Sequence, residues 1–246
     1  MKAIILAGGR GTRLAPFTTV LPKPLMPIAG VPILEIILWQ LKHFGFDNVT
    51  LACGYLAELM QAYILQNRIS REMKINFHFE DRPLGTAGAI GQIPNLSETF
   101  LVMNGDILTA IDYGELVRYH REHRAMLTIA VTKKRVQVSL GVLLLDSESR
   151  VVGYDEKPVK EFPASTGIYI YEPEVLNHIP RDQHLDFPTL VLNLVAAGKK
   201  VVGYQSDAFW LDIGNKEDFD RASEEVIRRR HELHADPCLA SLDARS

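Results

Sequence analysis

Short apolar runs that alternate with helical patterns dominate the first part of this 246-residue chain. Residues 3–7, 49–53 and 75–79 have the length and composition of buried strands. Apolar residues at helical spacing fill 33–44 and 57–66, between those strands. An order of strand, helix, strand, helix, strand predicts a parallel sheet covered by helices, in which ligands bind beyond the carboxyl ends of the strands.

The alternation continues to about residue 131 and then changes. No long helical pattern appears between 138 and 171, where short strands follow one another and predict an antiparallel excursion from the sheet. The later chain returns to helices and strands. The remaining predicted elements are strands at 99–106, 127–131 and 200–204 and helices at 112–124, 189–197 and 215–230.

A glycine-rich turn, residues 8–13 with the sequence Gly-Gly-Arg-Gly-Thr-Arg, directly follows the first strand. Three glycines remove side-chain bulk, so several backbone N–H groups can converge on an anion. Arg13 adds a planar guanidinium that suits two phosphate oxygens. Lys23 lies between Pro22 and Pro24, which we expect to hold the backbone of this lysine extended. Together these features predict a phosphate-binding site.

Two common phosphate-binding loops do not fit this turn. A P-loop needs a lysine directly after its last glycine, and none follows Gly11. A dinucleotide-binding fingerprint needs the spacing G-x-G-x-x-G, which Gly8, Gly9 and Gly11 do not give. An ordinary tight turn would remain open if the glycines stood alone. Arg13 and Lys23 make that alternative the weaker one.

Composition excludes several classes of function. The net charge is −3, so no global basic field indicates nucleic-acid binding. Cys53 and Cys238 are the only cysteines, too few for a disulfide framework or a zinc site by themselves. No apolar run approaches the ~18 residues that span a membrane. We therefore expect a cytoplasmic protein without nucleic-acid or membrane partners.

The sequence G-G-R-G-T-R-L, followed by L-P-K-P-L, resembles the signature of the sugar-1-phosphate nucleotidyltransferases, also called nucleotide-sugar pyrophosphorylases. The resemblance covers about residues 1–222 and is closest to the short mannose- and heptose-1-phosphate guanylyltransferases. It implies a Rossmann-like α/β fold: a three-layer αβα sandwich with a mixed, mostly parallel sheet and a small antiparallel excursion that binds the sugar. We expect one nucleotidyltransferase domain at 1–225 and a helix end with a tail at 226–246.

The resemblance also assigns roles around the phosphates. Arg13 and the glycine turn would hold the β- and γ-phosphates of a nucleoside triphosphate, and Lys23 the α-phosphate. Asp106 ends a buried strand in Asn-Gly-Asp and Asp212 lies in Trp-Leu-Asp-Ile-Gly, the two motifs whose acids share a metal in this family. Because Mg²⁺ retains waters and phosphate ligands, two carboxylates at strand ends suit it. Alone, each acid could be only a turn residue.

Glu80 bears on the choice of nucleobase, because related thymidylyl- and uridylyltransferases usually carry glutamine at this place. A carboxylate accepts hydrogen bonds only, and guanine offers two adjacent donors. We therefore favour GTP, with UTP or dTTP as the alternative; Glu80 could instead be a solvated charge at a strand end. The predicted nucleotide-binding residues are Leu6, Ala7, Gly8, Gly9, Gly11, Thr12, Glu80, Gly85, Thr86, Ala87 and Asn104.

The sugar 1-phosphate is assigned to the antiparallel excursion, again by resemblance. Gly141, Glu156, Lys157, Ser165 and Gly167 would line its site, with Lys157 on the phosphate and rigidified by the proline that follows. Many relatives carry asparagine where this chain has Ser165. The identity of the sugar therefore stays open, and Lys157 could also be an ordinary surface lysine.

Other interpretations remain. A glycosyltransferase would need a D-x-D motif, and the Asn104-Gly105-Asp106 run lacks the first acid. A catalytically silent relative that senses nucleotide sugars is argued against by the complete set of cations and acids. His120 and His123 are interpreted as packing or surface residues, since no metal-ligand spacing links them to other candidates. The segment 231–246 is interpreted as a loose tail or a contact in a homo-oligomer.

Overall fold

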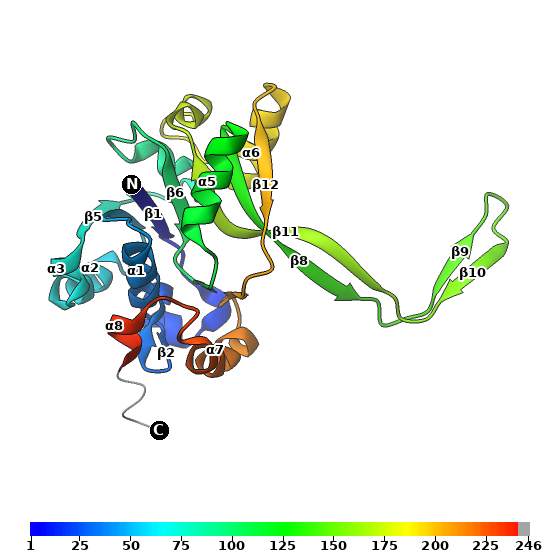
Figure 1. Cartoon of the computed structure of the whole chain (residues 1–246), viewed down its shortest axis with the longest axis horizontal. Helices are drawn as coiled ribbons and strands as arrows, with labels where there is room; N and C mark the ends of the chain where they lie inside the picture. The colour runs from blue at the N-terminus through cyan, green and yellow to red at the C-terminus, as the bar shows by residue number, and fades with distance from the viewer. Residues whose placement is uncertain (241–246) are drawn as a thin grey trace.

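The computed structural model describes residues 1–240, and its centre is a seven-stranded sheet (Figure 1). The strand order is β12-β8-β11-β6-β1-β4-β5. All neighbours are parallel except β11, which is antiparallel to both β6 and β8. The predicted mixed, mostly parallel sheet is thus confirmed. The strands are β1 Lys2–Ala7, β4 Asn48–Cys53, β5 Lys74–Phe79, β6 Phe100–Asn104, β8 Leu127–Gln137, β11 Val159–Tyr171 and β12 Val201–Gln205.

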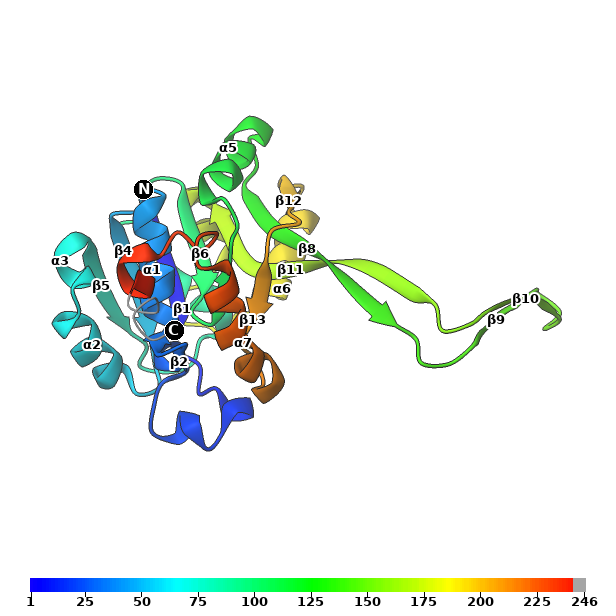
Figure 2. The same cartoon turned by 60° about the horizontal axis from the view of Figure 1, so that its bottom comes forward.

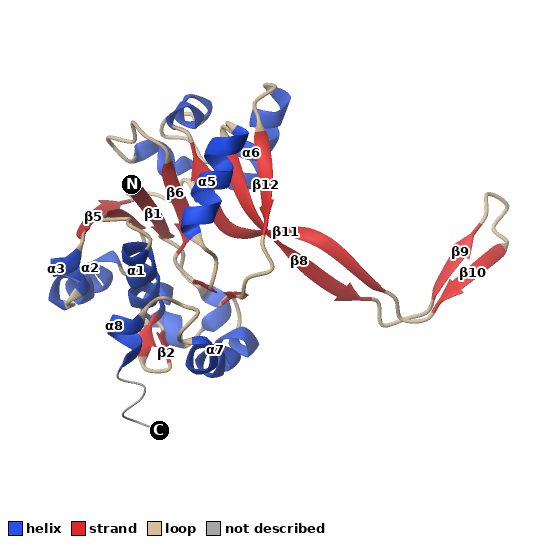
Figure 3. Cartoon of the chain, in the orientation of Figure 1, coloured by secondary structure: helices blue, strands red, loops and turns tan. Residues whose placement is uncertain are grey.

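Helices cover both faces of this sheet and complete the three-layer sandwich (Figure 3). Successive side chains of β1 point to opposite faces, so Ile5 packs in one buried cluster and Ile4 in the other. The first cluster lies under α1 Ile33–His43, α2 Ala57–Gln66, α3 Ile69–Glu72, α5 Tyr113–His123, α7 Lys216–Arg229 and α8 Asp236–Leu239. The second lies under α4 Gly85–Gly88, α6 Phe187–Ala196 and the 3₁₀ helices η4 Ile90–Gln92 and η5 Pro173–His178.

Local capping sets several helix ends. Asp112 accepts a hydrogen bond from the Glu115 N–H at 2.8 Å and begins α5, as Asn215 does for α7 through the Asp218 N–H at 2.9 Å. Pro32 is the residue before α1 rather than its first residue. These residues fix where the chain enters each helix.

The carboxyl ends of four adjacent strands meet at one edge of the sheet. Backbone hydrogen bonds tie the loops there: Gly105 N–H donates to the Leu6 carbonyl at 2.9 Å, and Glu80 N–H to the Cys53 carbonyl at 2.9 Å. The Tyr55 N–H donates to the Gly8 carbonyl at 3.2 Å. The glycine turn after β1 is therefore in contact with the segments that follow β4 and β6.

Residues 132–164, which we call the arm, leave the sheet as a two-stranded ribbon (Figures 1 and 2). The pairing of β8 with β11 runs outward from the sheet as far as Gln137 opposite Val159. A hairpin of β9 Val142–Leu145 and β10 Val151–Asp155 ends the arm. The predicted antiparallel excursion is confirmed. Its outer part leads away from the rest of the chain, which we call the body (Figures 1 and 2).

The segment after α7 belongs to the body. Leu233, Ala235 and Leu239 are buried in the same cluster as α1, and α8 packs on that helix. The interpretation of 231–240 as a loose tail is therefore wrong, since apolar side chains anchor it; residues 241–246 of that prediction lie outside the described part. Between residues 1 and 240, no helix has both the length and the apolar character needed to cross a membrane.

Candidate active site

A cavity of about 680 Å³ opens at the carboxyl edge of the sheet, between the glycine turn and the loops after β5 and β6. Such an edge is where open α/β sheets bind ligands. Most of the residues predicted to bind nucleotide or phosphate line this one cavity. They are Leu6, Ala7, Gly8, Gly9, Gly11, Thr12, Arg13, Lys23, Glu80, Gly85, Thr86, Asn104 and Asp106.

The glycine turn has a conformation that requires glycine at one position. Gly11 has φ +61°, and a Cβ there would lie 3.1 Å from Thr18 Cγ2 and 3.2 Å from Lys23 Cβ. The Thr18 hydroxyl donates to the Gly11 carbonyl at 2.8 Å and fixes the turn. Two one-turn 3₁₀ helices follow, η1 Thr12–Leu14 and η2 Phe17–Thr19. The turn therefore packs closely against the segment that carries Lys23.

Lys23 and Asp106 form a buried ion pair at the floor of the cavity. The expectation of an extended lysine backbone is wrong: Lys23 is the first residue of a 3₁₀ helix, η3 Lys23–Leu25. Pro24 fits that helix because its missing N–H would have had no partner in the first turn. The pair sets an ammonium and a carboxylate next to each other at a largely buried place, where charges interact more strongly than in bulk water.

Asp212 lies next to Asp106 although 106 positions separate them in the sequence. Its strand β13, Trp210–Asp212, pairs with β7, Ile107–Thr109, so that Asp212 is opposite Ile107. The Ile213 N–H also donates to the Asp106 carbonyl at 3.0 Å. Burial, with the negative charge of Asp106, raises the pKa of the Asp212 carboxyl above its ordinary value, while Lys23 and Arg13 oppose this.

The two acids fit a Mg²⁺ ion. One oxygen of each carboxylate, Oδ1 of Asp106 and Oδ1 of Asp212, is buried without a hydrogen-bond partner. Unpaired buried carboxylate oxygens are costly unless a cation meets them. Among residues 1–240 there is no cluster of three or more His, Cys, Asp or Glu side chains that could hold a metal. Two carboxylates suffice for Mg²⁺ when phosphates and waters supply the other ligands.

The guanidinium of Arg13 is next to this acidic pair. A Cβ added to Gly214 would lie 3.2 Å from Arg13 Nη2 and 3.2 Å from Asp212 Oδ1. Glycine at 214 therefore lets the arginine approach the chain that carries Asp212. Arg13, Lys23 and Asp106 line the cavity, whereas Asp212 lies next to Asp106 outside the lining.

Glu80 faces the glycine turn from the other side of the cavity. A Cβ at Gly8 would lie only 2.6 Å from Glu80 Oε1, so the carboxylate rests over a residue without a side chain. Burial raises the pKa of the Glu80 carboxyl, and the Leu84 N–H and His78 only partly oppose this. Glu80 is thus a desolvated acceptor inside the cavity rather than a solvated charge at a strand end.

The loop that enters α4 packs against the segment before α6. Gly85 has φ +75°, and a Cβ there would lie 2.7 Å from Asp186 Oδ1. The Thr86 hydroxyl accepts a hydrogen bond from the Phe187 N–H at 2.9 Å. Ala87 is fully buried and does not line the cavity, and its N–H donates to the Leu185 carbonyl at 3.0 Å, so its predicted contact with the nucleotide stays a prediction.

The residues predicted for the sugar phosphate are divided between two places. Gly167, with φ +75°, packs on Asn104 in the cavity wall, where a Cβ would lie 2.7 Å from Asn104 Nδ2. Ser165 accepts from the Gly167 N–H at 3.3 Å and donates to the Tyr169 hydroxyl at 3.3 Å. Both lie where β11 leaves the sheet, beside the cavity.

The other three residues of that group, Gly141, Glu156 and Lys157, lie on the arm. Within the described chain, nothing between residues 107 and 185 lines the cavity. Lys157 has φ +48°, so the extended backbone expected before a proline is wrong as well. In this structure the arm residues do not reach the cavity of their own chain, because the β8–β11 ribbon carries them away from it.

Comparison with known proteins assigns the family. Residues 2–229 match the nucleotidyl transferase family. The chain belongs to that family. A UTP–glucose-1-phosphate uridylyltransferase of Synechocystis is 35% identical over 93% of this chain, and a mannose-1-phosphate guanylyltransferase of Mycobacterium tuberculosis is 32% identical over 93%. The chain spans only 64% and 65% of the lengths of these two relatives.

A shorter relative matches this chain over nearly the whole length of both proteins. It is a D-glycero-α-D-manno-heptose 1-phosphate guanylyltransferase of Aneurinibacillus thermoaerophilus, 33% identical, with 92% of this chain and 98% of the relative covered. The crystal structure of HddC from Yersinia pseudotuberculosis complexed with GMP-PN is 26% identical with a TM-score of 0.69, covering 91% of this chain and 98% of that chain. The fold and the short domain organisation therefore have solved and curated counterparts.

Several residues that line the cavity of this nucleotidyl transferase were missed from the sequence. Tyr55 follows β4, and the same rule about carboxyl ends of strands would have found it; its hydroxyl donates to the Thr19 carbonyl at 3.0 Å. Arg10 lies over the Tyr55 ring at 5.7 Å. Asp186 gives no such signal, because it precedes a helix rather than following a strand. The missed residues are Arg10, Pro24, Gly54, Tyr55, Asp81, Arg82, Pro83, Ala89, Gly105 and Asp186.

The two histidines of α5 pack as the sequence indicated. His120 is fully buried and its ring is 2.8 Å from the Thr128 hydroxyl and 2.9 Å from a Glu172 carboxylate oxygen. Burial lowers the pKa of His120 even though Glu172 opposes this. His123 stacks on Tyr119 at a ring distance of 3.8 Å. Neither histidine lines the active-site cavity.

Proposed function

We propose that this protein transfers GMP from GTP to a sugar 1-phosphate and releases pyrophosphate. The observation that carries the proposal is the convergence of the glycine turn, Arg13, Lys23 and Asp106 around one cavity, with Asp212 directly behind Asp106 and one oxygen of each carboxylate unpaired. Such a set binds phosphates and provides no side chain poised as a nucleophile. It suits a reaction in which two phosphorylated substrates react with each other.

The reaction needs positioning and charge stabilisation rather than proton transfer. An oxygen of the sugar phosphate forms a bond to the α-phosphorus of GTP, and the bond from that phosphorus to the bridging oxygen breaks. Pyrophosphate leaves with the electron pair. Because both reactants are anions, Lys23 at the α-phosphate and Arg13 at the β- and γ-phosphates would offset their repulsion and the charge that develops.

Asp106 and Asp212 would hold a Mg²⁺ ion together with phosphate oxygens and water. When bound, this ion supplies further charge neutralisation at the triphosphate. Asp106 must then exchange its contact with Lys23 or share it, since one oxygen pairs with the lysine and the other is unpaired. Lys23 is thereby kept beside the place where the α-phosphate would bind.

Glu80 supports the preference for guanine. Its carboxylate is half-buried with a raised pKa, and guanine N1–H and its N2 amine are two donors that would offset the cost of this burial. Two relatives named guanylyltransferases and a solved complex with GMP-PN agree with this choice. The Synechocystis uridylyltransferase keeps UTP as the alternative nucleotide.

The sugar phosphate would lie beside the point where β11 leaves the sheet, near Ser165 and Gly167. Gly167 packs on Asn104 of the cavity wall, which makes this the side of the cavity away from Glu80 and the base. Lys157 and Glu156 would complete the site at the phosphate and the sugar. Mannose and heptose 1-phosphates are the first substrates to test, on the names of the relatives.

A pyrophosphate-release assay tests the proposal. The purified protein with Mg²⁺ is given GTP, ATP, CTP, UTP or dTTP, each combined with mannose, heptose or glucose 1-phosphate. We expect the largest kcat/KM with GTP. Release that is larger with UTP or dTTP would overturn the interpretation of Glu80 alone. Binding of nucleotide without any pyrophosphate release would show a sensor rather than an enzyme.

A further inference from the structure

The arm exposes apolar side chains that a monomer in water would be expected to cover. Six aliphatic residues in its outer half are between 49% and 71% exposed: Leu140, Leu143, Leu144, Leu145, Val151 and Val152. Tyr154 and Phe162 are 61% and 50% exposed. A two-stranded ribbon has no sheet face of its own to bury, so it is only marginally stable without another surface.

The exposed area matches what one protein partner needs. At roughly 100 Å² for each of these eight side chains, the arm presents on the order of 800 Å² of apolar surface, about one partner's share of a standard interface. The arm therefore has the dimensions and the chemistry of a docking element.

The arm also carries a small preformed polar cluster at its bend. Gly141 packs under Tyr154, where an added Cβ would overlap the phenol, and the Tyr154 hydroxyl donates to Glu156 Oε2 at 3.1 Å. Lys157 Nζ is 3.9 Å from Glu156 Oε1 and is held in a left-handed turn with φ +48°. Strained backbone at a non-glycine residue is more common at binding sites than elsewhere.

One side of the ribbon combines apolar groups with cations. Because Val136 is opposite Lys160 and Lys134 opposite Phe162, these four side chains share a face. Within residues 1–240, neither Lys134 nor Lys160 has a carboxylate partner, whereas Arg135 on the other face pairs with Glu161 at 2.7 Å. A complementary surface would be apolar and acidic.

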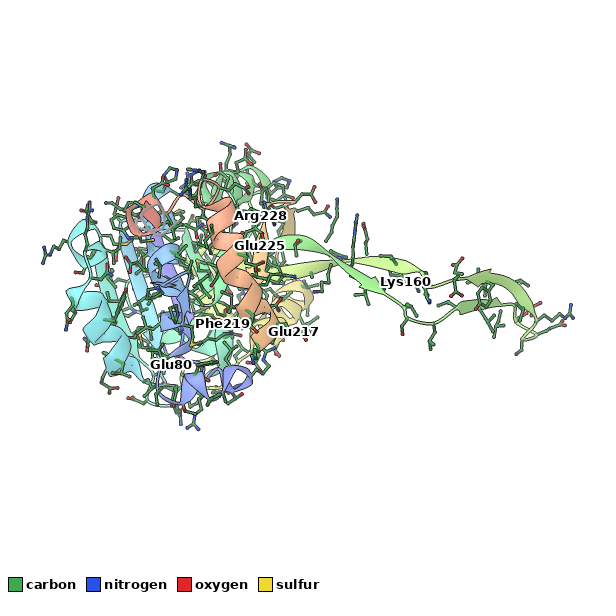
Figure 4. The ribbon with its side chains drawn as sticks, turned by 90° about the horizontal axis from the view of Figure 1, so that it is seen from below. Glu80, Lys160, Glu217, Phe219, Glu225 and Arg228 are labelled. Atoms are coloured by element: carbon green, nitrogen blue, oxygen red, sulfur yellow. The ribbon has the colours of Figure 1, made fainter. Side chains whose placement is uncertain are left out.

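The body offers such a surface beside the cavity. Phe17 and Val20, on the segment that follows the glycine turn, are 51% and 73% exposed. The ring of Phe17 lies 6.2 Å from that of Phe219 on α7, next to exposed Glu217. Figure 4 shows Glu217 and Phe219 on the body, while Lys160 lies out on the arm of the same chain. The two complementary surfaces cannot meet within one copy in this conformation.

We propose that the arm docks on a second copy of this chain, and that Lys157 and Glu156 of each copy complete the sugar-phosphate site of the other. The inference rests on the proposed function. If Lys160 contacts the acidic surface near Glu217, Lys157 lies three residues earlier in the chain. An extended chain of that length spans about 10 Å, which would place Lys157 toward the cavity mouth. A twofold dimer satisfies both arms at once.

Docking on a second copy requires no rearrangement of the sheet. The ribbon is continuous with β8 and β11, whose ladder runs from Leu127–Tyr171 in the sheet to Gln137–Val159 in the arm. For the arm to reach its own cavity, part of that ladder would have to break. A second copy meets the arm in the conformation that it already has.

Complementation between two inactive variants tests the exchange. Lys157→Ala, with an intact body, is co-expressed with Asp106→Asn, with an intact arm, each carrying a different affinity tag. In the heterodimer one site combines both intact parts, so we expect about half of the wild-type turnover per dimer. Each variant alone is expected on the order of 10²-fold lower. A heterodimer no more active than the two variants, with an active wild type, overturns the inference.

The state of assembly gives a test that does not depend on activity. Sedimentation of the wild type is expected to show a dimer, and the double substitution Leu143→Ser with Leu145→Ser a monomer. Leu192→Ser is the matched control, since Leu192 is 68% exposed on α6 of the body and should leave the dimer unchanged. A wild-type monomer at micromolar concentration overturns the inference. A dimer without transferase activity on any nucleotide would reject the proposed function and leave the arm contact standing.

Discussion

The body and the arm contain segments of the same two strands and bury them very differently. Ile168 and Ile170 of β11 are fully buried in the sheet, while Phe162 of the same strand is half exposed in the arm. Along β8 the side chains likewise change from buried at Leu127 to exposed beyond Thr132. Strand pairing alone therefore fixes the backbone, and burial depends on whether another layer covers the strand. The arm is a regularly paired two-stranded ribbon, but no other layer of the chain covers its side chains.

The largest expected effect is the difference in free energy of unfolding between a substitution in the body and one in the arm. Leu101→Ala removes a fully buried side chain of β6 and should lower the free energy of unfolding by about 2–5 kcal/mol. Leu144→Ala in the arm should change the unfolding of dilute protein by less than about 0.5 kcal/mol. Chemical denaturation measures both. A cost at Leu144 as large as that at Leu101, in monomeric protein, would end the distinction between body and arm.

The dependence of Tm on protein concentration gives a second comparison of the same two positions. If the arm is covered by a second copy, the Tm of the wild type rises with protein concentration, and Leu144→Ala weakens that dependence. Leu101→Ala lowers Tm at every concentration but should keep the slope. Scanning calorimetry over a hundredfold range of concentration would measure this.

We expect the catalytic rate to depend most on residues of the body. Asp106→Asn keeps the shape of the side chain but removes the charge that pairs with Lys23 and fits Mg²⁺, so we expect kcat to fall about 10²-fold or more, near 2.7 kcal/mol. Steady-state pyrophosphate release measures it, with circular dichroism as the control for folding. A variant with normal turnover would remove Asp106 from the mechanism.

A smaller effect is expected for the nucleobase. Glu80→Gln replaces an acceptor-only group by an amide, which complements uracil or thymine better than guanine. The ratio of kcat/KM for GTP to that for UTP should fall about tenfold or more, equivalent to about 1.4 kcal/mol. Competition between the two nucleotides in one reaction measures the ratio directly. An unchanged ratio would mean that Glu80 does not contact the base.

The smallest expected effect concerns pH. The folded protein lowers the pKa of His120, so the unfolded chain binds a proton more readily than the native one below a pH of about 6.5. The contribution of His120 to stability is therefore complete above that pH and is lost as pH falls toward the lowered value. His120→Gln should make the loss of stability between neutral and acidic pH smaller. The free energies of unfolding of the wild type and the variant would be measured in urea at pH 7.5 and 5.5. If His120 were already charged in the native state, both proteins would lose the same amount of stability between these pH values.

Much of the body could be predicted from sequence, because its signals are local. The helix predicted at 57–66 is α2 with the same bounds, and the strands around it agree to within one residue. Strong helical and strand periodicity decides such elements without tertiary information. The rule that ligands bind at the carboxyl ends of parallel strands then brought together residues that line one cavity, from Gly8 to Asp106.

The differences between prediction and structure are equally physical. Ala87 does not line the cavity, and its N–H is used by Leu185, about a hundred positions away, which no local pattern indicates. The prolines around Lys23 and Lys157 set limits on the backbone that a 3₁₀ helix and a left-handed turn also satisfy. For the arm, the apolar runs 142–145 and 151–152 predict that these side chains will be covered but do not indicate by what.

The order of strands has a consequence for synthesis of the chain. β8 is bonded on one side to β11 and on the other to β12, both of which come later in the sequence. On the ribosome, β8 has no neighbour in the sheet until β11 begins to emerge at Val159, and one edge of β6 stays open until Ile168–Tyr171 follow. The hairpin of β9 and β10 closes locally meanwhile, so the outermost element of the molecule is ready before half of the sheet that supports it.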